Sequence, residues 1–127
     1  MRLIAALLAF LAASVVDAAQ PVAPDPRTPV PDVRPLLLTA IDAPDGRAQG
    51  VLNGPLADAL TDRFKATSPI HIDVSTEQRY AQEGCRRLKV TFRQEGVALP
   101  GAAAPRRQTV DFRLNYCRDG RPPRSPP

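Results

Sequence analysis

The chain has 127 residues, 15 of them proline, and a formal net charge of +4 at pH 7. This length has room for one small domain and excludes a multidomain protein. The single histidine and the scattered carboxylates form no group of the three or four converging ligands that a metal site needs, and no glycine-rich phosphate-binding loop is present. We therefore predict no catalytic residue, no cofactor and no metal.

The first eighteen residues predict a secretory signal peptide. Arg2 precedes an apolar run over residues 3–16, and the small residues Ala18 and Ala19 follow. Cleavage is expected after Ala18 or Ala19. Because the run is shorter than the roughly 20 residues that cross a bilayer, we expect export to the periplasm and no stable membrane span.

Proline dominates the segment after the signal peptide. Six prolines fall within residues 21–35. Since proline fixes φ and has no N–H group, we expect a flexible, semi-extended leader over residues 19–35. The end of the chain, residues 120–127, is rich in proline and arginine and predicts a disordered tail. A single small domain over residues 36–119 lies between them, and a core of this size often needs a covalent crosslink.

The domain begins with two short elements. Residues 36–41 are an apolar run after a proline and predict a strand, and a turn is expected at Asp45-Gly46. A helix is predicted over residues 53–68, with Pro55 in its first turn and a proline directly after its end. Its apolar stripe, expected to pack onto a sheet, consists of Leu56, Leu60 and Phe64.

Three segments alternate strictly between apolar and polar residues and predict strands at 70–74, 88–92 and 110–116. The side chains of the last two strands that are expected to face the core are Leu88, Val90, Phe92, Val110, Phe112, Leu114 and Tyr116. The polar segment 76–84 and a loop at 96–105 connect these strands. The predicted fold class is therefore α+β, with one helix packed on a small, mostly antiparallel sheet in the order β-α-β-β-β.

Cys85 and Cys117 are the only cysteines, and in an exported chain they are expected to form one disulfide. They lie on the outward-facing parity, at the ends that meet if the last two strands form an antiparallel hairpin. Pairing them sets a register in which partner numbers sum to 202, so every inward residue meets an inward residue. This register also places Lys89 opposite Arg113, a like-charge pair that Asp111 on the diagonal can offset.

Basic residues are concentrated in the last third of the chain. Residues 84–127 carry ten basic and three acidic side chains, whereas residues 20–83 carry six basic and nine acidic ones. Two interpretations stay open: a cationic face for an acidic partner, or a solvated surface that a GC-rich coding sequence fills with arginine. The candidate partner surface consists of Arg86, Arg87, Lys89, Arg93, Arg113, Glu77, Arg79 and Tyr80.

These features favour a non-enzymatic periplasmic protein that binds another envelope protein. One alternative is a small periplasmic hydrolase or inhibitor-like module that uses His71 and Asp73, which share one face of a predicted strand with Ser75, together with Tyr80. A second alternative is a polyanion-binding module. Nucleic acid is not an expected partner, because the aromatic side chains of the strands are committed to the core.

Three stretches together resemble a family of small exported proteins: GPLADALTDRF (54–64), IDVSTEQRYAQEGCRRLKVTF (72–92) and VDFRLNYCRDGRPP (110–123). Proteins of this kind are encoded among the conjugative-transfer genes of Gram-negative plasmids and integrating elements. The resemblance implies an accessory role in a conjugative or type IV secretion apparatus, with a component of that apparatus as the partner. It transfers no catalytic residue.

Overall fold

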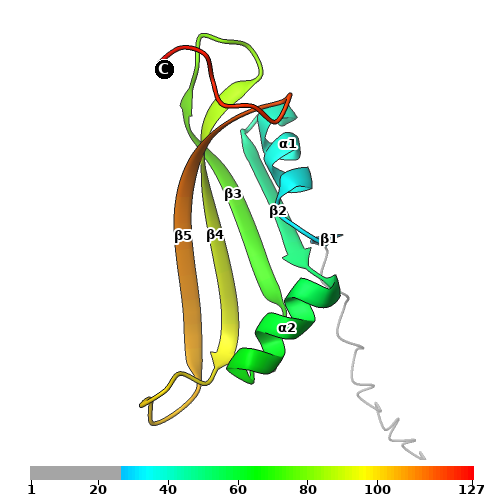
Figure 1. Ribbon diagram of the computed structural model, residues 1–127, viewed down its shortest axis with the longest axis vertical. Coiled ribbons are helices and arrows are strands. Elements are labelled where there is room, and N and C mark those ends of the chain that lie inside the picture. Colours follow the sequence, from blue (N-terminus) through cyan, green and yellow to red (C-terminus); the bar gives the residue numbers. More distant parts are fainter. Residues whose placement is uncertain (1–26) are drawn as a thin grey trace, which may run out of the picture.

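We describe residues 27–127 of the protein from a computed structural model (Figure 1). The predicted signal peptide and residues 19–26 of the predicted leader lie outside the described residues. Within residues 27–127, no helix is long and apolar enough to cross a membrane.

The described chain has an α+β fold, which confirms the predicted class. Its elements in chain order are β1 (Thr28–Val30), α1 (Arg34–Asp42), β2 (Arg47–Leu52), α2 (Gly54–Phe64), β3 (Ile70–Arg79), β4 (Cys85–Val97) and β5 (Arg106–Cys117). The five strands form one sheet in the order β1-β2-β3-β4-β5, in which only the pairing of β1 with β2 is parallel. Both helices contact the same face of the sheet, which we call the inner face (Figure 1); the opposite face is the outer face.

Residues 36–41 belong to helix α1, so the prediction of a strand there was wrong. Pro35 lies in the first turn of α1, where its missing N–H group would have had no helical partner. The side chains that α1 buries recur with the helical period and are Leu36, Leu37, Ala40 and Ile41. A short apolar run is compatible with a buried helix as well as with a strand. Here it forms a helix, so the fold has two helices where one was predicted.

Two strands of the sheet were not predicted. β1 lies within the predicted leader and pairs with β2, and Val30 at its end is only 3% exposed; the leader prediction is therefore wrong for residues 28–35. Proline is tolerated in β1 because it is an edge strand. In β2, a Cβ atom on Gly50 would lie 2.6 Å from Leu36 Cδ1 and 3.0 Å from the Thr28 carbonyl oxygen. The absence of a side chain at Gly50 thus lets α1 and β1 approach β2 closely.

The C-terminal hairpin has the predicted register. β4 and β5 pair from Cys85 with Cys117 through Gln94 with Gln108, each pair as expected. All three predicted strands extend further than expected. In particular, β3 continues to Arg79 past an irregularity between Thr76 and Gln78, so the first half of the predicted connection 76–84 is strand.

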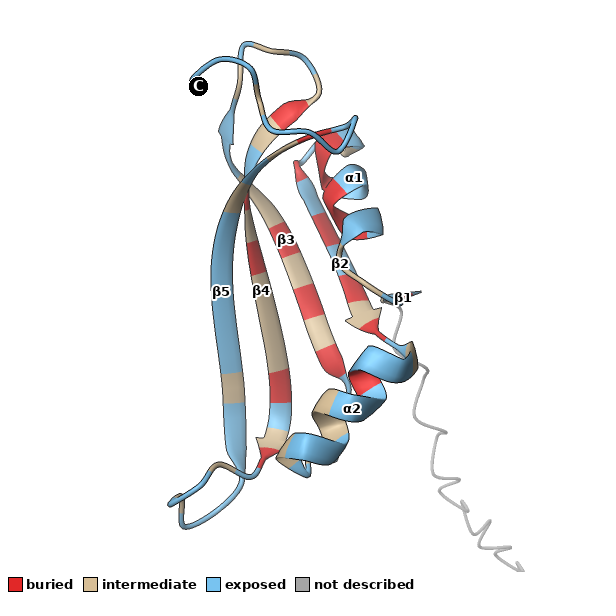
Figure 2. Ribbon diagram, viewed as in Figure 1, coloured by how far each residue is buried: buried red, intermediate tan, exposed pale blue. Residues whose placement is uncertain are grey.

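The hydrophobic core lies between α1 and the inner faces of β2, β3 and β4. Figure 2 shows buried residues alternating along these three strands, whereas β5 is exposed along most of its length. The largest fully buried side chains are Leu37, Ile72, Val74, Leu88, Val90 and Val97. β5 therefore continues the sheet beyond the part that the helices cover.

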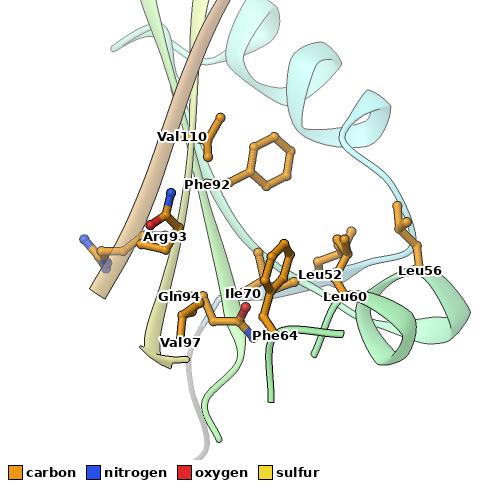
Figure 3. Close-up of a pocket in the computed structure, with 11 residues that line it drawn as sticks. Leu52, Leu56, Leu60, Phe64, Ile70, Phe92, Arg93, Gln94, Val97 and Val110 are labelled. Atoms are coloured by element: carbon orange, nitrogen blue, oxygen red, sulfur yellow. The ribbon is translucent and has the colours of Figure 1, made fainter. Parts of the chain in front are cut away.

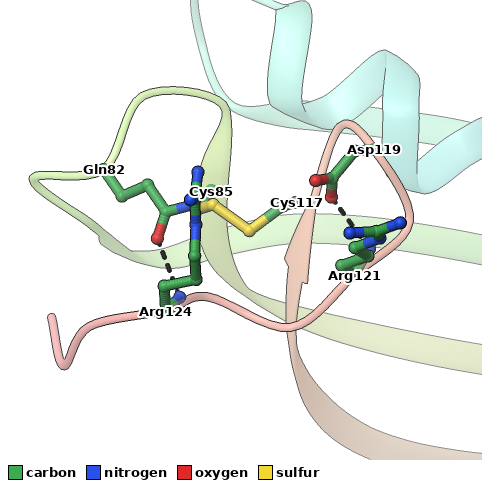
Figure 4. The surroundings of a disulfide bond; sticks show 6 residues. All are labelled: Gln82, Cys85, Cys117, Asp119, Arg121 and Arg124. Atoms are coloured by element: carbon green, nitrogen blue, oxygen red, sulfur yellow. Dashed lines mark hydrogen bonds between the residues drawn. A yellow bond between two sulfur atoms is a disulfide. The ribbon is translucent and has the colours of Figure 1, made fainter.

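A disulfide joins Cys85 to Cys117, as predicted, with their Cα atoms 4.0 Å apart. The cysteines were expected to face outward, but they are only 3% and 4% exposed. They are buried because the chain turns back beside them after β5: Arg118 N–H donates to the Gly84 carbonyl (2.8 Å), and Arg124 N–H donates to Gln82 Oε1 (2.8 Å; Figure 4). The segment 120–127, predicted to be disordered, has no helix or strand but lies against the β3–β4 loop.

Candidate functional site

The inner face of the sheet carries an apolar hollow next to α2 (Figure 3). Its volume is about 280 Å³. Leu56, Leu60 and Phe64 line it from α2, and the sheet side is lined chiefly by Leu52, Ile70, Phe92, Gln94, Val97, Gln108 and Val110. Arg93 also borders the hollow, but its side chain points away from the other lining residues in Figure 3. We call this feature the apolar hollow.

The hollow exists because α2 packs sparsely on the sheet. Ala57 is the one buried residue within α2, whereas α1 buries four. Gln94, itself 7% exposed, ties the end of α2 to β4: its Nε2 donates to Thr61 Oγ1 (3.2 Å) and to the Ser68 carbonyl (2.9 Å). The predicted apolar stripe of α2 therefore lines an open space, and Leu56 remains 51% exposed.

The apolar side of β5 is uncovered at Val110 and Phe112, whereas Leu114 and Tyr116 on the same side pack partly buried against the core. Val110 and Phe112 lie on the predicted inward parity, but they are 51% and 38% exposed because neither helix reaches over β5. The expectation that they are buried was therefore wrong, although their face was predicted correctly. Phe112 stacks on Phe92 with ring centroids 5.7 Å apart, which extends the apolar surface from the hollow toward the edge of the sheet.

Most basic residues of the predicted partner surface lie on the outer face and are interleaved with acidic ones. Glu77 lies at the centre: both of its carboxylate oxygens accept hydrogen bonds from Arg113 Nε (2.8 and 3.0 Å), and Arg87 Nε is 3.7 Å away. Lys89 Nζ is 4.0 Å from the Asp111 carboxylate, as the diagonal pairing predicted. This face therefore presents mixed charges instead of a continuous cationic patch, which favours the interpretation as a solvated surface.

Arg86 does not belong to this outer surface, contrary to the prediction. Its Nη2 donates to the Ile41 carbonyl at the end of α1 (3.0 Å), and its Nη1 is buried without a hydrogen-bond partner among the described residues. Burial lowers the pKa of the Arg86 guanidinium, and the positive charges of Arg79 and Arg118 lower it further. Arg86 therefore supports the C-terminal end of α1. In the register of β3 and β4, Arg79 lies opposite Arg86.

The residues of the predicted hydrolase alternative do not form one site. Asp73 accepts a hydrogen bond from Arg27 Nη1 (2.9 Å), and His71 Nδ1 is 3.3 Å from Arg93 Nη2. A shallow hollow on the outer face includes Asp73 and Ser75 but neither His71 nor Tyr80. Tyr80 lies beyond the end of β3, beside a separate hollow around the β3–β4 loop. The structure therefore brings Asp73 and Ser75 together and leaves Tyr80 apart.

No three His, Cys, Asp or Glu side chains of residues 27–127 are grouped so that they could hold a metal ion. Comparisons of the chain with protein-family models, with curated proteins and with solved structures gave no match.

The sequence predictions did not identify the apolar hollow as a site. Its α2 residues were assigned to the core because an i, i+4, i+8 stripe usually packs on a sheet. One signal was present: α2 has a single stripe, and the neighbouring positions Asp58, Thr61 and Asp62 are polar. A helix with so narrow an apolar stripe buries little surface, which is consistent with its sparse packing.

Proposed function

We propose that this protein is a binding module that captures an apolar segment of another protein in the hollow beside α2. The observation that carries the proposal is the exposed apolar surface formed by Leu56, Val110 and Phe112, which are 51%, 51% and 38% exposed. Apolar surface that is contiguous and open to water typically marks an interaction site. The mixed charges of the outer face make that side a weaker candidate.

The shape of the hollow indicates what it accepts. A volume of about 280 Å³ is just below the roughly 300–1,000 Å³ typical of small-molecule sites, so the hollow suits a few large apolar side chains of a polypeptide. Gln94 is already hydrogen bonded to Thr61 and Ser68, which leaves a wall dominated by aliphatic and aromatic groups. The expected ligand is therefore a segment that presents two or three leucine-like or aromatic side chains.

The proposed location is the bacterial envelope. The signal-peptide pattern of residues 1–18 and the Cys85–Cys117 disulfide both support export into an oxidising compartment, for which we propose the periplasm. The resemblance to proteins encoded among conjugative-transfer genes supports a partner in a conjugative or type IV secretion apparatus.

Photo-crosslinking in the native host tests this proposal. A photo-reactive residue at Leu56 faces the hollow, whereas one at Asp58 lies on the same helix about 200° away around its axis. We expect a defined adduct with one envelope protein from position 56 and none from position 58. The variant Leu56→Arg, probed from Val110, is expected to lose the adduct, and Asp58→Arg to retain it. Adducts of equal yield from positions 56 and 58, or none from either, would contradict the proposal.

A further inference from the structure

The outer edge of β5 is open. β5 is the last strand of the sheet, and no strand of residues 27–127 pairs with its other side (Figure 1). The main-chain N–H and C=O groups along such an edge are able to pair with another strand. Natural sheets usually protect long edges with proline, bulges, short strands or charged side chains. Residues 109–115 contain neither proline nor glycine, and their two charged side chains, Asp111 and Arg113, have opposite signs.

The disulfide shows which groups of β5 point to this edge. The Cα distance of 4.0 Å between Cys85 and Cys117 is that of a non-hydrogen-bonded pair, and in the adjacent pair Arg118 N–H donates to the Gly84 carbonyl. Odd-numbered residues of β5 therefore direct their N–H and C=O groups away from β4. The N–H of Cys117 agrees with this assignment, since it donates to the Arg121 carbonyl (3.1 Å). The returning tail thus occupies the edge at Cys117.

We infer that β5 pairs with β5 of a second copy of this chain, antiparallel, about a two-fold axis at Phe112. A two-fold axis perpendicular to the sheet keeps the inner faces on one side, so paired residues must have the same parity. With the axis at Phe112, residues 109–115 of both copies pair along their whole length, and this window ends before the tail at Cys117.

Charge complementarity selects this register. With the axis at Phe112, Asp111 lies opposite Arg113 of the partner subunit, and the symmetry repeats this pair. Asp111 and Arg113 are 42% and 46% exposed in the single chain, where Asp111 accepts a hydrogen bond from Thr91 Oγ1 (2.7 Å) and Arg113 donates to Glu77 (2.8 Å), so the exposed sides of both remain accessible to a second copy. Opposite charges facing each other across two strands stabilise the pairing, and like charges destabilise it.

The neighbouring registers are less favourable. An axis at Asp111 would place this aspartate opposite Asp111 of the partner subunit, and an axis at Arg113 would place this arginine opposite Arg113 of the partner subunit. Both registers put like charges opposite each other. An axis at Val110 would place Arg107 opposite Arg113 of the partner subunit. An axis at Leu114 would need the main chain of Cys117, whose N–H already donates to Arg121.

The inferred register also covers apolar surface. Val110 lies opposite Leu114 of the partner subunit, and Phe112 meets Phe112 of the partner subunit at the axis. These contacts cover part of the exposed inner face of β5, and they join the two inner faces into one ten-stranded sheet. The inference does not rest on the proposed function: the inferred contact covers Val110 and Phe112 in part and leaves Leu56 and the α2 side of the hollow open in each copy.

Two charge variants test the inference by sedimentation velocity over a range of protein concentrations. We expect a reversible dimer of the unmodified chain. Asp111→Arg places two pairs of arginines across the axis, and Arg113→Asp places two pairs of aspartates, so each variant alone is expected to raise the dimer dissociation constant by about tenfold or more. An equimolar mixture restores opposite charges in every pair and is expected to dimerise as the unmodified chain does. Asp119→Arg, the same charge change outside the window, is the control.

A second measurement tests the register itself and does not depend on the charge variants being folded. Phe112→Cys is expected to form a disulfide between two copies in a thiol buffer, because residue 112 meets its own copy at the axis. Val110→Cys is the control, since position 110 lies about 13 Å from its own copy in this register. The inference is overturned by a monomer at all concentrations, by a dimer that Asp111→Arg leaves unchanged, by a mixture that fails to recover, or by equal crosslinking from positions 110 and 112.

Discussion

Loss of the Cys85–Cys117 disulfide is expected to destabilise the protein strongly and to release β5 first. Among residues 27–127 of a single chain β5 pairs with β4 alone, and the disulfide joins the end of that pair farthest from the β4–β5 loop. Val110 and Phe112 gain little from burial at 51% and 38% exposure, and Leu114 and Tyr116 are only partly buried against the core. The position of β5 therefore depends largely on main-chain bonds and the crosslink.

The size of the effect follows from the length of the closed loop. The cysteines are 32 residues apart, and the chain-entropy relation then gives about 3.7 kcal/mol at 25 °C. For a domain of this size, 1 kcal/mol changes the melting temperature by roughly 4–8 °C. The double variant Cys85→Ala/Cys117→Ala is therefore expected to melt roughly 15–30 °C below the oxidised protein.

Thermal and denaturant unfolding of the oxidised protein, the reduced protein and the double variant measure this difference. Hydrogen exchange should show that amides of β5 lose protection before those of β2 and β3. The reasoning is refuted if both the reduced protein and the variant melt within about 5 °C of the oxidised protein, or if β5 is as protected as β3 in the variant.

Three further changes have expected outcomes of known sign. Gly50→Ala should lower the free energy of unfolding, measured by chemical denaturation, by about 1–3 kcal/mol, because its Cβ would lie 2.6 Å from Leu36 Cδ1. Gln49→Ala, at the exposed neighbouring position, should change this free energy little. Gln94→Ala should lower the free energy of unfolding by about 1–3 kcal/mol and increase hydrogen exchange in α2, since it removes the hydrogen bonds to Thr61 and Ser68. Gln108→Ala, on the neighbouring strand, is the control. A similar loss of stability in Gln108→Ala would contradict the role of Gln94. The side-chain and main-chain hydrogen bonds from Arg34 hold the pKa of Asp32 below its ordinary value of 3.8. Ionised Asp32 therefore stabilises the folded protein at pH values above 3.8, and this contribution is lost as the pH falls through the lowered pKa. The melting temperatures of the protein and of Asp32→Asn should accordingly converge in acid, and a constant difference at all pH values would exclude this linkage.

The part of the fold that could be predicted from sequence is the part with strict alternation. The register of β4 and β5 followed from two cysteines and the parity of apolar residues, because a slip of one residue would turn every apolar side chain to the other face. α1 and β2 could not be predicted in this way. The apolar run of α1 is as compatible with a strand as with a helix, and β2 consists largely of small and polar residues, with Ala48 and Gly50 in the positions that face α1.

The candidate site was beyond prediction for a related reason. Periodicity identifies which face of an element is apolar, but it does not tell whether another element covers that face. Phe112 and Leu56 were assigned to the correct faces, yet their exposure depends on where α1 and α2 end relative to the width of the sheet. The outer face shows the converse. The ten basic and three acidic side chains of residues 84–127 left a cationic face open as one interpretation, and the fold instead places Glu77 and Asp111 among the basic side chains.

The order of strands across the sheet is the same as their order along the chain. Each strand therefore finds its partner in the segment that emerged just before it, and no strand has to insert between two others. In the proposed export, in which the N-terminal end of the chain leaves the channel first, strands can be added one at a time, each to the edge that the preceding strand presents. In that order β5 is added last, and the disulfide that fixes it closes only after Cys117 has followed Cys85 out of the channel.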